Sequence, residues 1–167
     1  ENAGKPLSPY AITKVCNEQY ADVFGRLFQM EIIGFRYFNI FGPRQSPGGP
    51  YAAVIPLFIL NLLKNVSPYI NGDGSVTRDF TFVENAVQAN VLGMLTDNKH
   101  AVGQVYNVAV GERNSLMKLF ETIQKLTNSS LPPVFREPRP GDIHDSLADI
   151  SKATTLLQYS PKVKIDK

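Results

Sequence analysis

The chain has 167 residues, of which 43% are hydrophobic and 19% are charged, and its formal net charge is +2 at pH 7. This length and composition are typical of a globular domain with a hydrophobic core, and they exclude a disordered or fibrous chain. The lysines and arginines are scattered along the sequence rather than gathered into a basic stripe, so we expect no nucleic-acid partner.

The cysteine and histidine content and the lengths of the apolar runs bear on disulfides, metal sites and membrane spans. The single cysteine, Cys16, cannot form an intrachain disulfide, which favours a reducing, cytoplasmic compartment. Cys16 lies in a helical apolar pattern, and we interpret it as a buried structural thiol. His100 and His144 have no cysteine or histidine at ligand spacing, so we expect no metal site. The longest apolar run, 52–63, is too short to span a bilayer, so we expect no membrane partner.

Hydrophobic periodicity predicts a long first helix over 9–30. Pro9 suits the first turn of a helix, and apolar side chains then recur at three- and four-residue spacing. They cover more than one stripe, which indicates a helix that contacts more than one surface. These side chains are Ile12, Val15, Cys16, Tyr20, Val23, Phe24, Leu27 and Phe28.

Helices and strands alternate along the rest of the chain. In chain order the pattern predicts a strand over 32–40, a Gly- and Pro-rich loop over 41–50, a helix over 53–64, a strand over 69–71, a turn over 72–75, a strand over 78–83, a helix over 84–96, a strand over 105–109, a helix from its cap at 115 to 126, a strand over 134–136, a turn over 139–142 and a helix over 151–157. Such alternation is typical of an α/β protein. The later strands are short and irregularly spaced, which indicates the end of a wound sheet (1–50) followed mainly by a small mixed lobe (51–167), with some segments returning to the sheet.

The stretch SPYAITK at 8–14 places a phenol and an ammonium four residues apart on the first helix. Residues i and i+4 share one helical face, so Tyr10 and Lys14 point the same way. Phenols ionise near pH 10 in water, and a neighbouring ammonium stabilises the phenolate. The pair is suited to proton transfer at neutral pH, and a surface aromatic beside a lysine is the ordinary structural alternative.

Further motifs give this pair a context. SPYAITK is followed by RYFNIFGPRQ at 36–45, GGPYAAVIPLF at 48–58, YINGDGSVTRDFTFVEN at 69–85, NVAVGE at 107–112 and RPGDIHDSLADISKA at 139–153. In this order they resemble the extended short-chain dehydrogenase/reductases, and among these the NAD-dependent sugar-nucleotide epimerases. The likeness is closest to the UDP-N-acetylglucosamine 4-epimerases of bacterial surface-polysaccharide pathways.

The resemblance implies a Rossmann-like α/β fold with a small mixed α/β substrate-binding lobe, and NAD as the cofactor. Family members hold the NAD pyrophosphate at a glycine-rich strand–turn–helix, and they carry a catalytic Ser or Thr well ahead of the tyrosine. This sequence has no G-x-x-G-x-x-G, and only nine residues precede Tyr10. We therefore expect this chain to be the C-terminal portion of a longer enzyme. We expect these residues alone neither to bind NAD nor to catalyse epimerisation.

By this resemblance, Tyr10 is the catalytic acid/base, which takes the proton of the sugar 4-hydroxyl while hydride leaves C4. Lys14 hydrogen-bonds the nicotinamide ribose and supports the phenolate. Tyr37 lies at the end of the predicted strand, where ligands gather in open α/β sheets, and we expect it at the cofactor. Asn39, just beyond, is expected to bond a sugar or phosphate oxygen.

The resemblance also implies substrate contacts in the second part of the chain. Ala53 and Val54 begin a helix after two glycines, where small residues let backbone amides approach a diphosphate. Tyr69 and Asn71 lie where the family holds uracil, largely through backbone groups. Ordinary helix and strand packing is the alternative at these positions.

Arg78 and Arg139 are expected to anchor the diphosphate, because a guanidinium matches phosphate oxygens bidentately. Asp142 is expected to accept hydrogen bonds from the ribose hydroxyls, and it also suits the RPGD turn. Ser146 is expected beside the hexose. Family members restricted to UDP-glucose and UDP-galactose carry a tyrosine there, whereas a serine leaves space for a 2-acetamido group. A solvated arginine and an exposed loop serine are the structural alternatives.

The resulting prediction is an NAD-dependent UDP-N-acetylglucosamine 4-epimerase, which inverts C4 through a 4-keto intermediate. A uronate 4-epimerase, a 4,6-dehydratase and a decarboxylase stay open as related enzymes, and a non-catalytic nucleotide-sugar-binding module stays open as a different class. Family members pair through the helix at 9–30, so we expect the whole protein to be a homodimer.

Overall fold

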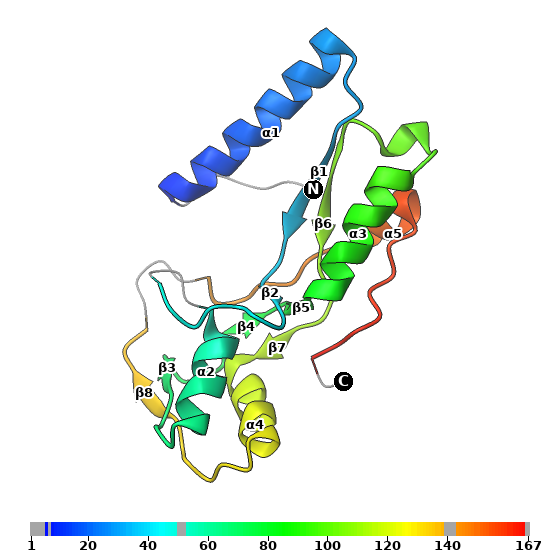
Figure 1. The fold of residues 1–167 in the computed structure, drawn as a ribbon. Coiled ribbons are helices and arrows are strands. Elements are labelled where there is room, and N and C mark those ends of the chain that lie inside the picture. Colours follow the sequence, from blue (N-terminus) through cyan, green and yellow to red (C-terminus); the bar gives the residue numbers. More distant parts are fainter. Residues whose placement is uncertain (1–5, 7, 50–52, 139–142, 166–167) are drawn as a thin grey trace.

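The structure is a computed structural model that describes residues 6, 8–49, 53–138 and 143–165. Two hydrophobic cores form two regions, which lie one above the other in Figure 1 and meet at two pairs of very short strands.

The first region is built on two parallel strands, β1 (Ile33–Tyr37) and β6 (Gln104–Val108), which pair along their whole length. Helices α3 (Val83–Leu95) and α5 (Ser151–Leu157) lie on one side of this pair, and α1 (Pro9–Phe28) lies on the other (Figure 1). The core of this region consists of Ala86, Ala89, Ala101, Tyr106, Val108, Ala153, Leu157 and Tyr159.

The second region packs α2 (Val54–Leu63) against α4 (Leu116–Leu126), beside the parallel pair β3 (Tyr69–Asn71) and β8 (Val134–Arg136). Its core consists of Ile55, Phe58, Leu62, Ile70, Phe80, Leu119, Phe120 and Ile123. The rings of Phe58 and Phe120 meet edge to face across the two helices, with centroids 5.9 Å apart, a favoured aromatic geometry.

Short strands connect the two regions. β2 (Ile40–Phe41) pairs in parallel with β5 (Thr81–Phe82), and β4 (Thr77–Arg78) pairs antiparallel with β7 (Asn114–Ser115). The chain passes the start of α3 at Gly42, where an added Cβ would lie 2.6 Å from a methyl group. Glycine is therefore required for this close approach.

The expected alternation of helices and strands is confirmed, and most element ends shift by no more than two residues. Two expected strands are each divided in two. Asn39, with φ +37°, interrupts 32–40, and Asp79 and Phe80 turn inward between β4 and β5. The expected turn at 139–142 lies outside the described residues. The sequence did not predict β7 or the 3₁₀ helix η1 (Lys99–Ala101).

Helix α1 has no buried side chain. Its more covered residues recur on one narrow face that includes Val15, Glu18, Ala21 and Gly25. Cys16 lies off this face and is exposed, so our interpretation of it as a buried thiol was wrong. Besides Tyr10, the large apolar side chains exposed on the helix are Ile12, Tyr20, Val23, Phe24, Leu27 and Phe28.

Candidate active site

Local capping fixes the start of α1 and so places Tyr10 and Lys14. Ser8 is extended, and its Oγ accepts a hydrogen bond from Ala11 N at 3.1 Å, as a helix N-cap should. Pro9 then occupies the first turn. Tyr10 and Lys14 share one face, with Lys14 Nζ 5.1 Å from the centre of the Tyr10 ring. Tyr10 is 66% exposed, which leaves the phenol accessible to a ligand.

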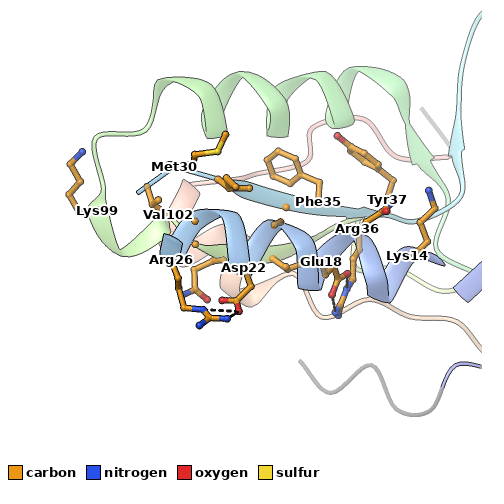
Figure 2. A pocket seen from close by; sticks show the side chains of 18 of the residues that line it. Lys14, Glu18, Asp22, Arg26, Met30, Phe35, Arg36, Tyr37, Lys99 and Val102 are labelled. Atoms are coloured by element: carbon orange, nitrogen blue, oxygen red, sulfur yellow. Dashed lines mark hydrogen bonds and ion pairs between the residues drawn. The ribbon is translucent and has the colours of Figure 1, made fainter. Parts of the chain in front are cut away.

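A groove of about 740 Å³ lies between α1 and β1 (Figure 2). Tyr10, Lys14 and Tyr37 all line it, so the three residues predicted to contact the cofactor share one groove. β6 pairs with one edge of β1, and within the described ranges no strand pairs with the other edge. Arg36 points toward α1, whereas Phe35 and Tyr37 point toward α3 (Figure 2), so the groove continues around this open edge.

An ion pair joins the two walls of the groove. Arg36 Nε and Nη2 donate to the two carboxylate oxygens of Glu18 at 2.7 and 2.6 Å. The hydrogen bonds from Arg36 lower the pKa of Glu18, and they outweigh the opposing effect of burial. Glu18 follows Lys14 by one helical turn. The ion pair therefore attaches the face of α1 that carries Tyr10 and Lys14 to β1.

The end of β1 is bonded to neighbouring elements on both sides. Tyr37 Oη donates to Asn90 Oδ1 on α3 at 3.0 Å. Asn39 Nδ2 donates to the backbone oxygen of Asp79 at 3.3 Å, and Asn39 O accepts from Thr81 N at 3.2 Å. Asn39 thus links the strand end to the segment that carries Arg78.

Arg78 and Ser146 lie on segments that are bonded together. Arg78 Nη1 donates to Thr77 O at 2.7 Å and to Ile143 O at 2.6 Å. Thr77 Oγ1 donates to Asp145 Oδ1 at 2.8 Å. These bonds hold 143–145 against β4, and the half-buried Ser146 follows directly.

A buried carboxylate lies next to Arg78. The Asp79 side chain has no exposed surface. Its Oδ1 accepts from Val110 N at 3.0 Å, and its Oδ2 accepts from Gly111 N at 3.0 Å and Ala148 N at 3.4 Å. Burial raises the pKa of Asp79, and the backbone N–H groups oppose this effect.

The other predicted substrate residues lie in the second region. Tyr69 and Asn71 belong to β3, and the guanidinium of Arg136 on β8 lies 3.1 Å from the centre of the Tyr69 ring. Ala53 is the N-cap of α2 and has no side-chain acceptor for the first N–H groups. Val54 begins the helix and packs against the core while staying partly exposed.

Arg139 and Asp142 lie outside the described residues, and their contacts stay predictions. Sequence reasoning missed Glu18, Arg36 and Asp79. Glu18 could have been found, because it continues the four-residue spacing of the phenol–ammonium pair. Asp79 gave only a weak signal, namely a carboxylate inside an apolar strand pattern. Across the residues that the structure covers, no three His, Cys, Asp or Glu side chains could hold a metal ion, and no helix could cross a membrane.

Solved structures of nucleotide-sugar enzymes share this fold. UDP-N-acetylglucosamine 4-epimerase from Methanobrevibacter ruminantium M1, in complex with UDP-N-acetylmuramic acid, matches with a TM-score of 0.90 and 39% identity over 97% of this chain and 51% of that one. UDP-glucuronic acid 4-epimerase from Bacillus cereus, in complex with UDP-glucuronic acid and NAD, matches with a TM-score of 0.87 and 35% identity over 97% and 50%. The expected Rossmann-like α/β fold class is confirmed.

The chain belongs to the NAD dependent epimerase/dehydratase family, whose model matches residues 1–109. A putative UDP-glucose 4-epimerase of Methanocaldococcus jannaschii is 36% identical over 160 residues, which cover 96% of this chain and 50% of that protein. The chain spans about half the length of the curated relatives it matches. The family resemblance seen in the motifs is therefore confirmed.

The Glu18–Arg36 ion pair yields a prediction about stability. Glu18→Gln removes a charge-assisted contact, so we expect it to lower the free energy of unfolding of the whole protein by about 1 kcal/mol at neutral pH. Because the pKa of Glu18 is lowered in the folded state, this contribution is present above the ordinary glutamate pKa of the unfolded chain and is lost as pH falls through the lower folded-state pKa. Thermal melts of both proteins should therefore converge in acid.

The matched control is Asp22→Asn, which removes the exposed pair between Asp22 and Arg26 on the same helix. We expect it to change the melting temperature less than Glu18→Gln does, because exposed i,i+4 pairs on a helix contribute only about 0.3–0.5 kcal/mol. Equal effects of the two substitutions at neutral pH would show that the Glu18 pair has no special role.

Proposed function

We propose that the whole protein is an NAD-dependent 4-epimerase that prefers UDP-N-acetylglucosamine and supplies surface-polysaccharide precursors. The observation that carries this proposal is the Tyr10–Lys14 pair, a phenol and an ammonium one turn apart on the wall of a groove. Its support is membership of the NAD dependent epimerase/dehydratase family. Without this family membership, an exposed tyrosine and lysine one turn apart on a helix would not indicate epimerase chemistry.

The residues of the groove suit the nicotinamide–ribose end of NAD. Lys14 offers an ammonium that can donate to ribose hydroxyls, and Tyr37 lines the same groove at the end of β1. Tyr10 takes the proton of the sugar 4-hydroxyl as C4 becomes a ketone, and it returns the proton after the sugar has presented its other face. Bound NAD supplies the hydride acceptor and is restored in each cycle.

We assign the UDP-sugar to the second region and to the short strands that connect it with the first region. We propose that Arg78 and Arg139 bind the diphosphate and that Asp142 binds the ribose, while Asn39 contacts the sugar. Further proposed substrate contacts are Ala53, Val54, Tyr69, Asn71 and Ser146. The bonds from Arg78 to Ile143 O and from Thr77 to Asp145 support a shared site, because they hold the segment before Ser146 against the strand of Arg78.

The choice of an N-acetylated sugar depends on the size of Ser146. The M. ruminantium enzyme, which is 39% identical, is a UDP-N-acetylglucosamine 4-epimerase. A UDP-hexuronate is the second candidate substrate, because the similar B. cereus enzyme acts as a UDP-glucuronic acid 4-epimerase. Both candidates use the same proton transfer at C4.

Replacing Tyr10 tests the catalytic assignment. Tyr10→Phe keeps the ring and deletes the proton relay, so in the whole protein we expect kcat to fall by about 10²–10⁴-fold with little change in KM. Tyr20→Phe is the matched control, since Tyr20 is equally exposed on the same helix, and it should keep full activity. Retained turnover in the Tyr10 variant would contradict the proposed role.

Enlarging Ser146 tests the substrate preference. A tyrosine ring would occupy the space needed by a 2-acetamido group, so Ser146→Tyr should reduce kcat/KM for UDP-N-acetylglucosamine at least about tenfold more than for UDP-glucose. Ser130→Tyr, on an exposed loop, should change neither. An equal loss on both substrates would mean that Ser146 does not select the sugar.

We also propose that the whole protein is a homodimer through α1. Val23, Phe24 and Leu27 expose large apolar surface on this helix, which is costly to leave in water. Analytical ultracentrifugation at micromolar concentration should show a dimer, and Leu27→Glu should shift it toward monomer. A wild-type protein that sediments as a monomer would contradict this prediction.

A further inference from the structure

The proposed reaction assigns no role to the Asp79 carboxylate. It is fully buried, and its backbone oxygen accepts the side-chain amide of Asn39. Its two carboxylate oxygens accept backbone N–H groups from two further segments, the loop after β6 and the segment after Ser146. One residue therefore contacts three stretches of chain that are far apart in sequence.

None of these three stretches is held by a long strand ladder or a helix at the point of contact. Asn39 lies between β1 and β2, and Gly111 lies in a loop with φ +79°. Ala148 follows 143–146 in a segment without regular structure. A carboxylate that accepts several N–H groups can substitute for such ladders, because a hydrogen bond to a charged acceptor is stronger than one between neutral groups.

We propose that Asp79 is a positioning residue, which holds Arg78 and the segment bearing Ser146 in the arrangement that binds the nucleotide sugar. Arg78 directly precedes Asp79 in the chain. Ala148, two residues after Ser146, donates its backbone N–H to the Asp79 carboxylate. Arg78 Nη1 fixes the other end of the same segment through Ile143 O. Ser146 is thus fastened on both sides, at Ile143 and at Ala148. This inference rests on the proposed function.

Asp79→Asn in the whole protein tests the proposal. The substitution keeps the shape but replaces one carboxylate oxygen by an NH₂ group, which faces backbone N–H donors and cannot accept from them. We expect KM for the UDP-sugar and the Kd of UDP, measured by calorimetry, to rise at least about tenfold, with kcat at saturation and NAD affinity within about threefold of wild type.

Tyr106→Phe is the matched control, because it deletes another buried side-chain hydrogen bond, from Tyr106 Oη to Ala101 O at 2.8 Å, away from Arg78 and 143–148. It should lower the melting temperature without changing KM or UDP affinity. The proposal is overturned if Asp79→Asn leaves UDP affinity unchanged, or if UDP and NAD affinities fall together as they would after general destabilisation.

A second variant covers the case in which Asp79→Asn does not fold. Ala148→Pro removes the N–H group that the Ser146 segment donates, while the carboxylate keeps its bonds from Val110 N and Gly111 N. It should also raise KM and weaken UDP binding, and a folded variant with unchanged UDP affinity would overturn the proposal.

Calorimetry with UDP separates this proposal from the proposed function. A wild-type protein that binds UDP but converts no UDP-sugar would contradict the epimerase assignment, and the effect of Asp79→Asn on UDP affinity would still decide the role of Asp79. A wild-type protein that does not bind UDP would overturn the positioning role as well.

Discussion

Parallel pairing of β1 with β6 is the constraint on which the arrangement of the candidate site depends. Parallel strands end at the same edge of a sheet, so the residues that follow β1 and those that follow β6 must meet. The last residue pair is Tyr37 with Val108, and the next residue, Phe38, still donates its N–H to Val108 O at 3.0 Å. This edge therefore gathers Asn39 and the loop of Val110 and Gly111 around Asp79.

The two cores depend on short connections rather than on a shared hydrophobic interior. β2 and β5 contribute only two residues each, and between β5 and β4 the chain turns Asp79 and Phe80 inward. Phe80 enters the core of the second region, while the Asp79 carboxylate bonds the loops of the first. A buried charge is tolerated there because backbone donors replace the water that it has lost.

Helix α1 is attached differently. Only a narrow face is partly covered, and the bidentate contact between Glu18 and Arg36 supplies its clearest polar link to β1. The helix carries a phenol–ammonium pair in its first two turns and large exposed apolar side chains in its last two turns. One helix thus presents both the proposed catalytic groups and the proposed dimer surface, so changes in one surface can alter the orientation of the other.

The sequence by itself determined the order of helices and strands, because apolar periodicity and capping residues act over a few neighbours. Ser8, Pro9 and the spacing of Tyr10 and Lys14 define the start of α1 without reference to the rest of the chain. The motifs were also sufficient for the family, since each is a local run of residues.

Only the tertiary structure decided which distant residues meet. No local pattern shows that Glu18 bonds Arg36, that Arg78 bonds Ile143 O, or that Asp79 accepts from the chain around residues 110 and 148. Cys16 illustrates the same limit, since its apolar spacing indicated burial while the single covered face of α1 leaves it exposed. Periodicity reports which side chains could be buried, but the partner surface that buries them is formed by residues far away in the sequence.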